Sequence, residues 1–107
     1  MLGSSYKGHG PADEKFEVRV ADAAHPITRG VTDYPAVDEH HWPVIHAKDI
    51  HLFMRTSGNH VNGYTRMHGA GRVCYLATGH HRPMLELPSM QQLMANAALW
   101  CVSALRA

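Results

Sequence analysis

The chain has 107 residues, enough for one domain with a modest core, and its 45% apolar and 18% charged residues are ordinary for a globular protein. The formal net charge is only +1 and no cluster of lysines and arginines occurs, so nucleic acid is not expected as a partner. The ten histidines are unusual and predict that solubility or assembly depends on pH at about pH 6.

We expect the protein to be cytoplasmic, because the N-terminal segment lacks the apolar core of a signal peptide. A membrane is not expected as a partner, since the C-terminal apolar region is interrupted by Gln91, Gln92 and Asn96 and is too short to span a bilayer. Cys74 and Cys101 lack CxxC spacing and fall in apolar segments. Both are therefore expected to be buried small hydrophobic residues.

The first third of the chain contains one clear strand. Residues 1–15 hold several glycines and a polar run, which predicts an irregular opening segment. Residues 16–20 alternate apolar and polar, the pattern of a strand with one covered face. In residues 25–30 a proline fixes φ and a glycine ends the segment, which predicts one short helical turn. Residues 31–37 are expected to be a loop, because Pro35 prevents a clean strand.

The remainder predicts three strands and a helix. Residues 50–56 are mostly apolar, which favours a central strand. Residues 61–67 and 72–76 are expected to form a hairpin around Gly69, since glycine takes positive φ without steric cost. Residues 89–105 carry apolar side chains at three- and four-residue spacing, which predicts a helix whose apolar stripe covers a sheet.

A polar loop at residues 78–81 separates the last strand from this helix, and a short linker bracketed by Pro83 and Pro88 follows it. The loop contains Gly79 and His80. In open α/β sheets, ligands bind at loops beyond the carboxyl ends of strands. This loop is therefore the first candidate site.

Three polar residues at the ends of predicted strands, Glu39, His60 and His80, are expected to converge on one pocket, with His9 or His40 as further members. Imidazole nitrogens and a carboxylate oxygen would suit zinc or another divalent metal. The spacing is not diagnostic, because there is no HExxH and no pair of histidines at helical i, i+4 spacing. Sugar binding through hydrogen bonds is an equal alternative for this pocket.

The catalytic candidates are therefore His80, His60 and Glu39, and acid–base chemistry between Glu39 and either histidine stays open. A nucleophilic enzyme is disfavoured, because Cys74 lies in a predicted strand and Ser57 lacks the GxSxG setting that exposes a serine. The substrate-binding candidates are Arg29, Trp42, Tyr64 and Gly79.

Structural interpretations compete with these roles. Asp38 and Glu39 are equally consistent with a solvated loop pair or with a cap on neighbouring backbone. Arg29 is equally consistent with a structural residue that pairs with Asp33 or Asp38. His25, directly before a proline, suits a turn residue.

Six motifs follow one another along the chain: His25-Pro26-Ile27-Thr28-Arg29-Gly30, Asp38-Glu39-His40, Thr56-Ser57-Gly58-Asn59-His60, Gly69-Ala70-Gly71-Arg72-Val73, Gly79-His80 and Asn96-Ala97-Ala98-Leu99-Trp100. In these motifs and their order the chain resembles ThuA-like (trehalose utilisation) proteins over nearly its whole length. The resemblance implies an α/β, flavodoxin-like fold of the class I glutamine amidotransferase type, here a partial sheet with a C-terminal helix packed on it.

Residues 1–107 look like the C-terminal half of such proteins, a single domain lacking the N-terminal half, so a homo-oligomer or a partner supplying that half is expected. Fold analogy alone does not assign glutamine hydrolysis. The family's links to disaccharide and keto-sugar metabolism imply that the chain binds or acts on a sugar-like small molecule, with or without a divalent metal such as zinc. The alternatives are a non-catalytic interaction or oligomerisation module, or an inactive remnant of a longer protein.

Overall fold

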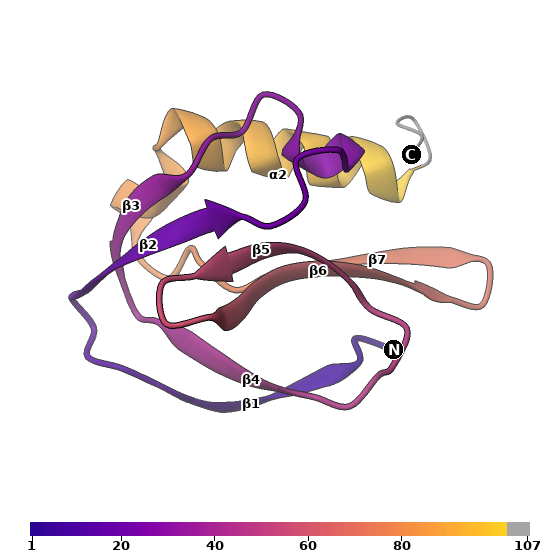
Figure 1. Ribbon diagram of the computed structural model, residues 1–107, viewed down its shortest axis with the longest axis horizontal. Coiled ribbons are helices and arrows are strands. Elements are labelled where there is room, and N and C mark those ends of the chain that lie inside the picture. The colour runs from indigo at the N-terminus through magenta and orange to yellow at the C-terminus, as the bar shows by residue number, and fades with distance from the viewer. Residues whose placement is uncertain (103–107) are drawn as a thin grey trace.

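The computed structural model describes residues 1–102 and consists mainly of strands with a C-terminal helix (Figure 1). Three layers are stacked: the helix α2, a five-stranded sheet and a two-stranded sheet. The elements are β1 (Ser4–His9), β2 (Glu14–Val20), the 3-10 helix η1 (Pro26–Thr28), β3 (Tyr34–Asp38), β4 (His41–Ile45), β5 (His51–Thr56), β6 (His60–His68), β7 (Gly71–Leu76), α1 (Arg82–Leu85) and α2 (Pro88–Cys101).

The five-stranded sheet has the order β3-β2-β5-β6-β7, and every neighbouring pair in it is antiparallel. β1 and β4 form a separate antiparallel ribbon that packs against β6 on the side away from α2 (Figure 1). The predicted sheet with a C-terminal helix packed on it is therefore confirmed. The parallel pairing of a flavodoxin-like sheet does not occur within residues 1–102.

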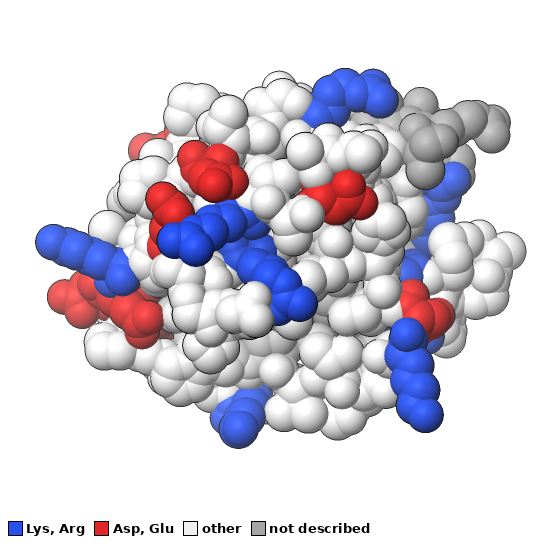
Figure 2. Space-filling model, in the orientation of Figure 1, with Lys and Arg blue, Asp and Glu red and all other residues white. Residues whose placement is uncertain are grey.

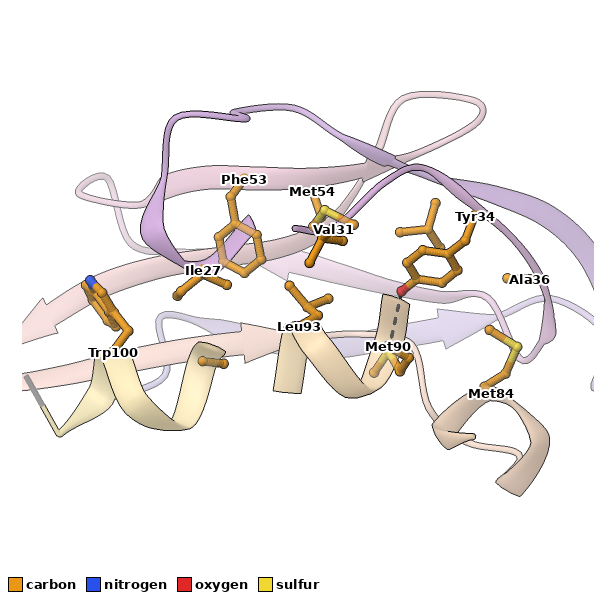
Figure 3. Close-up of a cluster of buried hydrophobic side chains, with 12 residues drawn as sticks. Ile27, Val31, Tyr34, Ala36, Phe53, Met54, Met84, Met90, Leu93 and Trp100 are labelled. Atoms are coloured by element: carbon orange, nitrogen blue, oxygen red, sulfur yellow. Dashed lines mark hydrogen bonds between the residues drawn. The ribbon is translucent and has the colours of Figure 1, made fainter. Parts of the chain in front are cut away.

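The main core lies between α2 and the five-stranded sheet (Figure 3). The helix contributes Met90, Leu93 and Trp100, whose spacing places them on one face, and Phe53 of β5 lies opposite them. The Tyr34 hydroxyl donates a 3.4 Å hydrogen bond to the sulfur of Met90. Burial raises the pKa of Tyr34 to about 12. This packing, with the contacts of α2 to η1 and β7, holds the helix against one face of the sheet.

Most of the predicted elements are confirmed. Four strands, β2, β5, β6 and β7, correspond to the predicted segments 16–20, 50–56, 61–67 and 72–76. β5 is central, between β2 and β6. Gly69, at φ +60°, makes the turn between β6 and β7, and η1 is the predicted helical turn within residues 25–30.

Three predictions of irregular structure are wrong. Residues 1–15 contain β1 and the start of β2; most of β1 is exposed, so its sequence carries no alternation that would reveal a strand. Residues 31–37 contain most of β3, a strand that tolerates Pro35 because it lies at the edge of the sheet. The linker expected between Pro83 and Pro88 contains most of the short helix α1.

The long helix begins at Pro88, one residue before its predicted start, and ends at Cys101; the predicted positions 103–105 lie outside the described residues. Cys74 and Cys101 are half-buried free thiols packed against the core, rather than fully buried residues. Burial raises the pKa of Cys74 to about 12. The described helices include none that is long and apolar enough to cross a membrane.

Candidate functional site

The loop that follows β7 is held by one buried carboxylate, that of Asp38. Buried and exposed residues alternate along β3, and this places Asp38 fully inside the protein at the end of the strand. Its Oδ2 accepts hydrogen bonds from the amides of Gly79 (2.8 Å) and His80 (3.0 Å). Its Oδ1 accepts from the amides of His81 (3.0 Å) and Glu39 (2.9 Å). Three charge-assisted bonds therefore tie the loop to the end of β3, and the fourth, from Glu39, lies within the Asp38 segment itself.

The path of this loop requires a glycine. Gly79 has φ +130°, which L side chains rarely adopt, and a Cβ there would lie 3.1 Å from Cδ2 of Leu85. On the far side of the loop, the His81 imidazole donates a hydrogen bond to the carbonyl of Ala12. Between these two anchors the side chain of His80 is 47% exposed. The loop thus presents one imidazole to solvent from a fixed backbone.

That imidazole meets two other potential ligands. Glu39 Oε2 lies 3.2 Å from His80 Nε2, and Glu39 Oε1 lies 3.2 Å from His41 Nε2. One ligand-type atom from each of these three residues lies within 4.8 Å of the others. We call Glu39, His41 and His80 the Glu39 cluster. His9 Nε2 is 3.8 Å from Glu39 Oε1 and flanks the cluster.

The surroundings of Glu39 act on its pKa in two directions. Burial opposes ionisation, but the hydrogen bond from His41 and the charges of His80, His9 and His41 outweigh it and lower the pKa below the ordinary value of 4.5. Glu39 is therefore a carboxylate at neutral pH. In that form it can accept protons and hydrogen bonds or bind a cation.

His60 lies outside the Glu39 cluster. Its ring meets His40 edge-on, with centroids 5.0 Å apart, and lies 6.2 Å from the ring of Trp42. His40 is almost fully buried, and its two ring nitrogens lie 3.0 Å from Glu14 Oε2 and 2.8 Å from Thr56 Oγ1. The structure therefore brings together two of the three residues predicted as metal ligands, with His41 beside them.

A surface groove of about 210 Å³ adjoins the Glu39 cluster. It is lined by three aromatic rings, two serines, an imidazole, a proline and a leucine: Tyr6, Trp42, Tyr75, Ser4, Ser5, His41, Pro43 and Leu2. The rings of Tyr6 and His41 meet edge-on at 5.8 Å. Nε1 of Trp42 is a buried donor without a hydrogen-bond partner in the described part of the chain. His41 belongs both to this groove and to the Glu39 cluster.

A family model described as trehalose utilisation, ThuA, matches residues 1–101. The chain belongs to the ThuA family. This membership suggests an α/β fold and a role in trehalose utilisation. No curated protein matches the chain.

Two of the motifs that resemble the ThuA family have a structural role in this chain. The Asn96 amide donates to the carbonyls of Ile27 (2.9 Å) and Arg29 (2.8 Å), so the C-terminal motif holds the first motif in place. The sequence proposes Arg29 as a substrate contact or as a partner of Asp33 or Asp38. Arg29 forms no salt bridge within residues 1–102. The carboxylates of Asp33 and Asp38 accept hydrogen bonds from backbone amides instead.

The other predicted substrate contacts lie in different settings. Tyr64 is fully buried, and its ring stacks on that of Tyr75. The Tyr64 hydroxyl donates a hydrogen bond to the carbonyl of Leu2 (2.9 Å) and accepts one from the Ser4 hydroxyl (2.7 Å). The amide of Gly79 is occupied by the carboxylate of Asp38. Trp42 is the one substrate-binding candidate that lines the groove.

Sequence reasoning missed His41 and Tyr6. Both lie in the β1 and β4 ribbon, which the sequence did not predict. Predicting a strand that begins at His41 would have distinguished the two adjacent histidines. His40 is buried, whereas His41, the first residue of that strand, stays partly exposed beside Glu39. Without that strand the two adjacent histidines were indistinguishable.

Proposed function

We propose that this ThuA-family chain binds a sugar or keto-sugar in the groove beside the Glu39 cluster, and that the cluster supplies the polar chemistry of the site. His41 carries this proposal, because it lines the groove and also contacts Glu39 at 3.2 Å. A ligand seated in the groove would thus lie next to a carboxylate and two imidazoles.

The chemistry of the groove suits a carbohydrate. Sugar rings combine apolar faces with hydroxyl groups, and pockets for them need aromatic surfaces together with a few convergent donors and acceptors. Tyr6, Trp42 and Tyr75 provide aromatic surface, and Ser4 and Ser5 provide hydroxyls. The low share of charged groups along the groove fits a neutral ligand.

The Glu39 cluster also fits a divalent cation such as zinc. Two imidazole nitrogens and one carboxylate oxygen are a ligand set used by catalytic zinc sites, and here they come within 4.8 Å of one another. A bound metal would act as a Lewis acid toward a substrate oxygen. The lowered pKa of Glu39 keeps its oxygens deprotonated, and the Asp38-bound loop holds His80 in reach.

Acid–base roles follow the same geometry. His80 and Glu39 form an ion pair at 3.2 Å, and we propose that they supply the acid–base groups of the site. His60, the third catalytic candidate, would act from the adjacent ring group of His40 and Trp42. Replacing His80 by alanine should remove turnover or ligand binding without unfolding the protein.

Trehalose binding tests the groove directly. In a titration with trehalose followed by NMR, with and without zinc, Tyr6→Ala should weaken binding by about tenfold, because it removes an exposed ring that a sugar face would cover. Val44→Ala is the matched control, since Val44 is exposed on the same ribbon but does not line the groove. Equal affinities for the two variants would contradict the proposal.

The edge strand β7 supports a second candidate function, that of an interaction module. Within residues 1–102 β7 has one neighbouring strand, β6, and all its residues after Gly71 are half buried. A further strand can pair with this edge, supplied by another copy or by a partner that carries the N-terminal half. Light scattering over a dilution series should then give a mass above 11.9 kDa that falls on dilution; a constant monomer mass would contradict the oligomer.

A further inference from the structure

A second depression lies beside the ends of β2 and β5. It has a volume of about 400 Å³ and is lined by two arginines and by the turn between β5 and β6, including Arg19, Arg55, Thr56, Gly58 and Asn59. The turn belongs to the motif of residues 56–60, of which the proposed sugar site uses only His60. Figure 2 shows positive side chains gathered in the middle of one face, over β2 and β5, with acidic side chains beside them.

The two arginines are direct cross-strand partners. Arg19 of β2 and Arg55 of β5 stand opposite each other in the antiparallel register, so their side chains leave the same face of the sheet. Like charges in this arrangement repel unless they are compensated. Glu17 Oε1 lies 2.6 Å from Nε of Arg19 and compensates one charge. Arg55 forms no salt bridge within the described residues, so one positive charge remains over the depression.

Donor groups on both arginines remain available. The contact with Glu17 uses only Nε of Arg19, and Arg55 uses only Nη1, which donates to the carbonyl of Asn59 at 3.1 Å. The other guanidinium N–H groups have no hydrogen-bond partner among residues 1–102. Two planar donor groups that approach one space from two strands can bind an oxyanion from two directions.

The turn at the edge of the depression is preorganised. Gly58 and Asn59 both have positive φ, at +87° and +65°, and the Asn59 amide donates to the carbonyl of Thr56 at 2.8 Å. Two hydrogen bonds join Ser57 to Glu17: the Ser57 amide donates to the Glu17 carbonyl at 2.9 Å, and the Glu17 amide donates to the Ser57 hydroxyl at 3.1 Å. A turn that is already ordered loses little conformational entropy when a ligand binds beside it.

We propose that Arg19 and Arg55 form a binding site for the phosphate group of a small molecule. The two guanidinium groups offer free donors, and the uncompensated charge of Arg55 attracts a phosphate monoester, which carries a charge of about −1.5 to −2 at neutral pH. A phosphate would also relieve the repulsion between the two arginines. The site is separate from the aromatic groove, because the residues that line the two depressions do not overlap.

Titration with inorganic phosphate, followed by amide NMR shifts, tests this site. In the wild type the shifts should concentrate at residues 19–21 and 55–59, and acetate should bind at least about tenfold more weakly than phosphate. Arg19→Gln and Arg55→Gln should each weaken phosphate binding by about tenfold or more. Arg82→Gln is the matched control, since Arg82 is exposed and also pairs with a glutamate, Glu86, at 2.9 Å; it should change the affinity less than about twofold.

The proposal is overturned if phosphate does not bind, if the shifts map elsewhere, if acetate binds equally well, or if Arg82→Gln weakens binding as much as the other two variants. The wild-type titration decides the location even if a variant fails to fold. Trehalose binding should be unchanged in Arg55→Gln, so failure of the phosphate site and failure of the sugar site give different results.

Discussion

Asp38 and Glu39 are neighbours in sequence and both are carboxylates, yet they occupy opposite kinds of environment. Asp38 has no exposed surface and accepts hydrogen bonds from four backbone amides. The Glu39 side chain is 16% exposed and lies among imidazoles. The first carboxylate therefore holds the backbone of a loop, and the second meets the side chain that this loop presents.

The difference shows how the protein builds a polar site on a small scaffold. A carboxylate saturated by amide donors has no capacity left for a ligand, but it fixes the position of His80. A carboxylate beside imidazoles keeps its oxygens available for protons or a metal. The alternation along β3 separates the two roles within one dipeptide. Substitutions can therefore remove the structural role of Asp38 and the chemical role of Glu39 separately.

The largest effect is expected from Asp38→Asn. An amide side chain replaces one carboxylate oxygen by a donor, so two of the four backbone amides lose their acceptor inside the protein. The free energy of unfolding should fall by about 2–4 kcal/mol. Glu39→Gln is the control and should lower it far less, because no backbone amide depends on the Glu39 carboxylate. Urea denaturation at neutral pH measures both, and equal losses would show that the two carboxylates do not differ in role.

A smaller effect is expected from Gly79→Ala, which strains the same loop without touching Asp38. The alanine must adopt φ near +130° with its methyl group against Leu85, and the cost should be about 1–3 kcal/mol. Gly69→Ala, at φ +60° in open space, is the comparison and should cost less. Thermal denaturation ranks the two variants; a larger loss for Gly69→Ala would contradict the tight path assigned to the loop.

The smallest effect concerns acid stability. Because the folded protein holds the pKa of Glu39 below 4.5, this group contributes stability that is complete above that pH and is lost as the pH falls through the folded-state pKa. Between about pH 6 and about pH 3, Glu39→Gln should therefore lose less unfolding free energy than the wild type. Denaturation curves at the two pH values measure this difference, and parallel losses would mean that the imidazoles do not act on Glu39.

The elements that the sequence predicts are those whose apolar residues recur on one face, because that face is buried in the core. The alternation in residues 16–20 and the spacing of Met90, Leu93 and Trp100 identified β2 and α2 because both elements cover the main core. β1 was not predicted because it pairs only with β4 in a two-stranded ribbon, and the residues of both strands stay at least partly exposed. β3 was hidden by Pro35, which an edge strand accommodates.

The candidate site was predictable in part for the same reason. The sequence predicts that Glu39 and His80 share a pocket, and the Asp38 carboxylate does join these two chain segments, although the strand before Glu39 is not evident from the sequence. His60 was chosen over His41 because the strand β4 was not foreseen, and only that strand places His41 next to Glu39. The pairing of Asp38 with backbone amides depends on contacts across 41 to 43 residues, which no local pattern reveals.

Zinc binding by calorimetry tests the central claim, that Glu39, His41 and His80 form one site which the buried Asp38 positions. The wild type should bind one zinc ion, and His41→Ala should weaken the affinity by about tenfold or more. His60→Ala should leave it within about threefold, because His60 packs on His40 and Trp42 instead. Loss of zinc binding in His60→Ala with retention in His41→Ala would contradict the claim, as would a wild-type protein that binds no zinc.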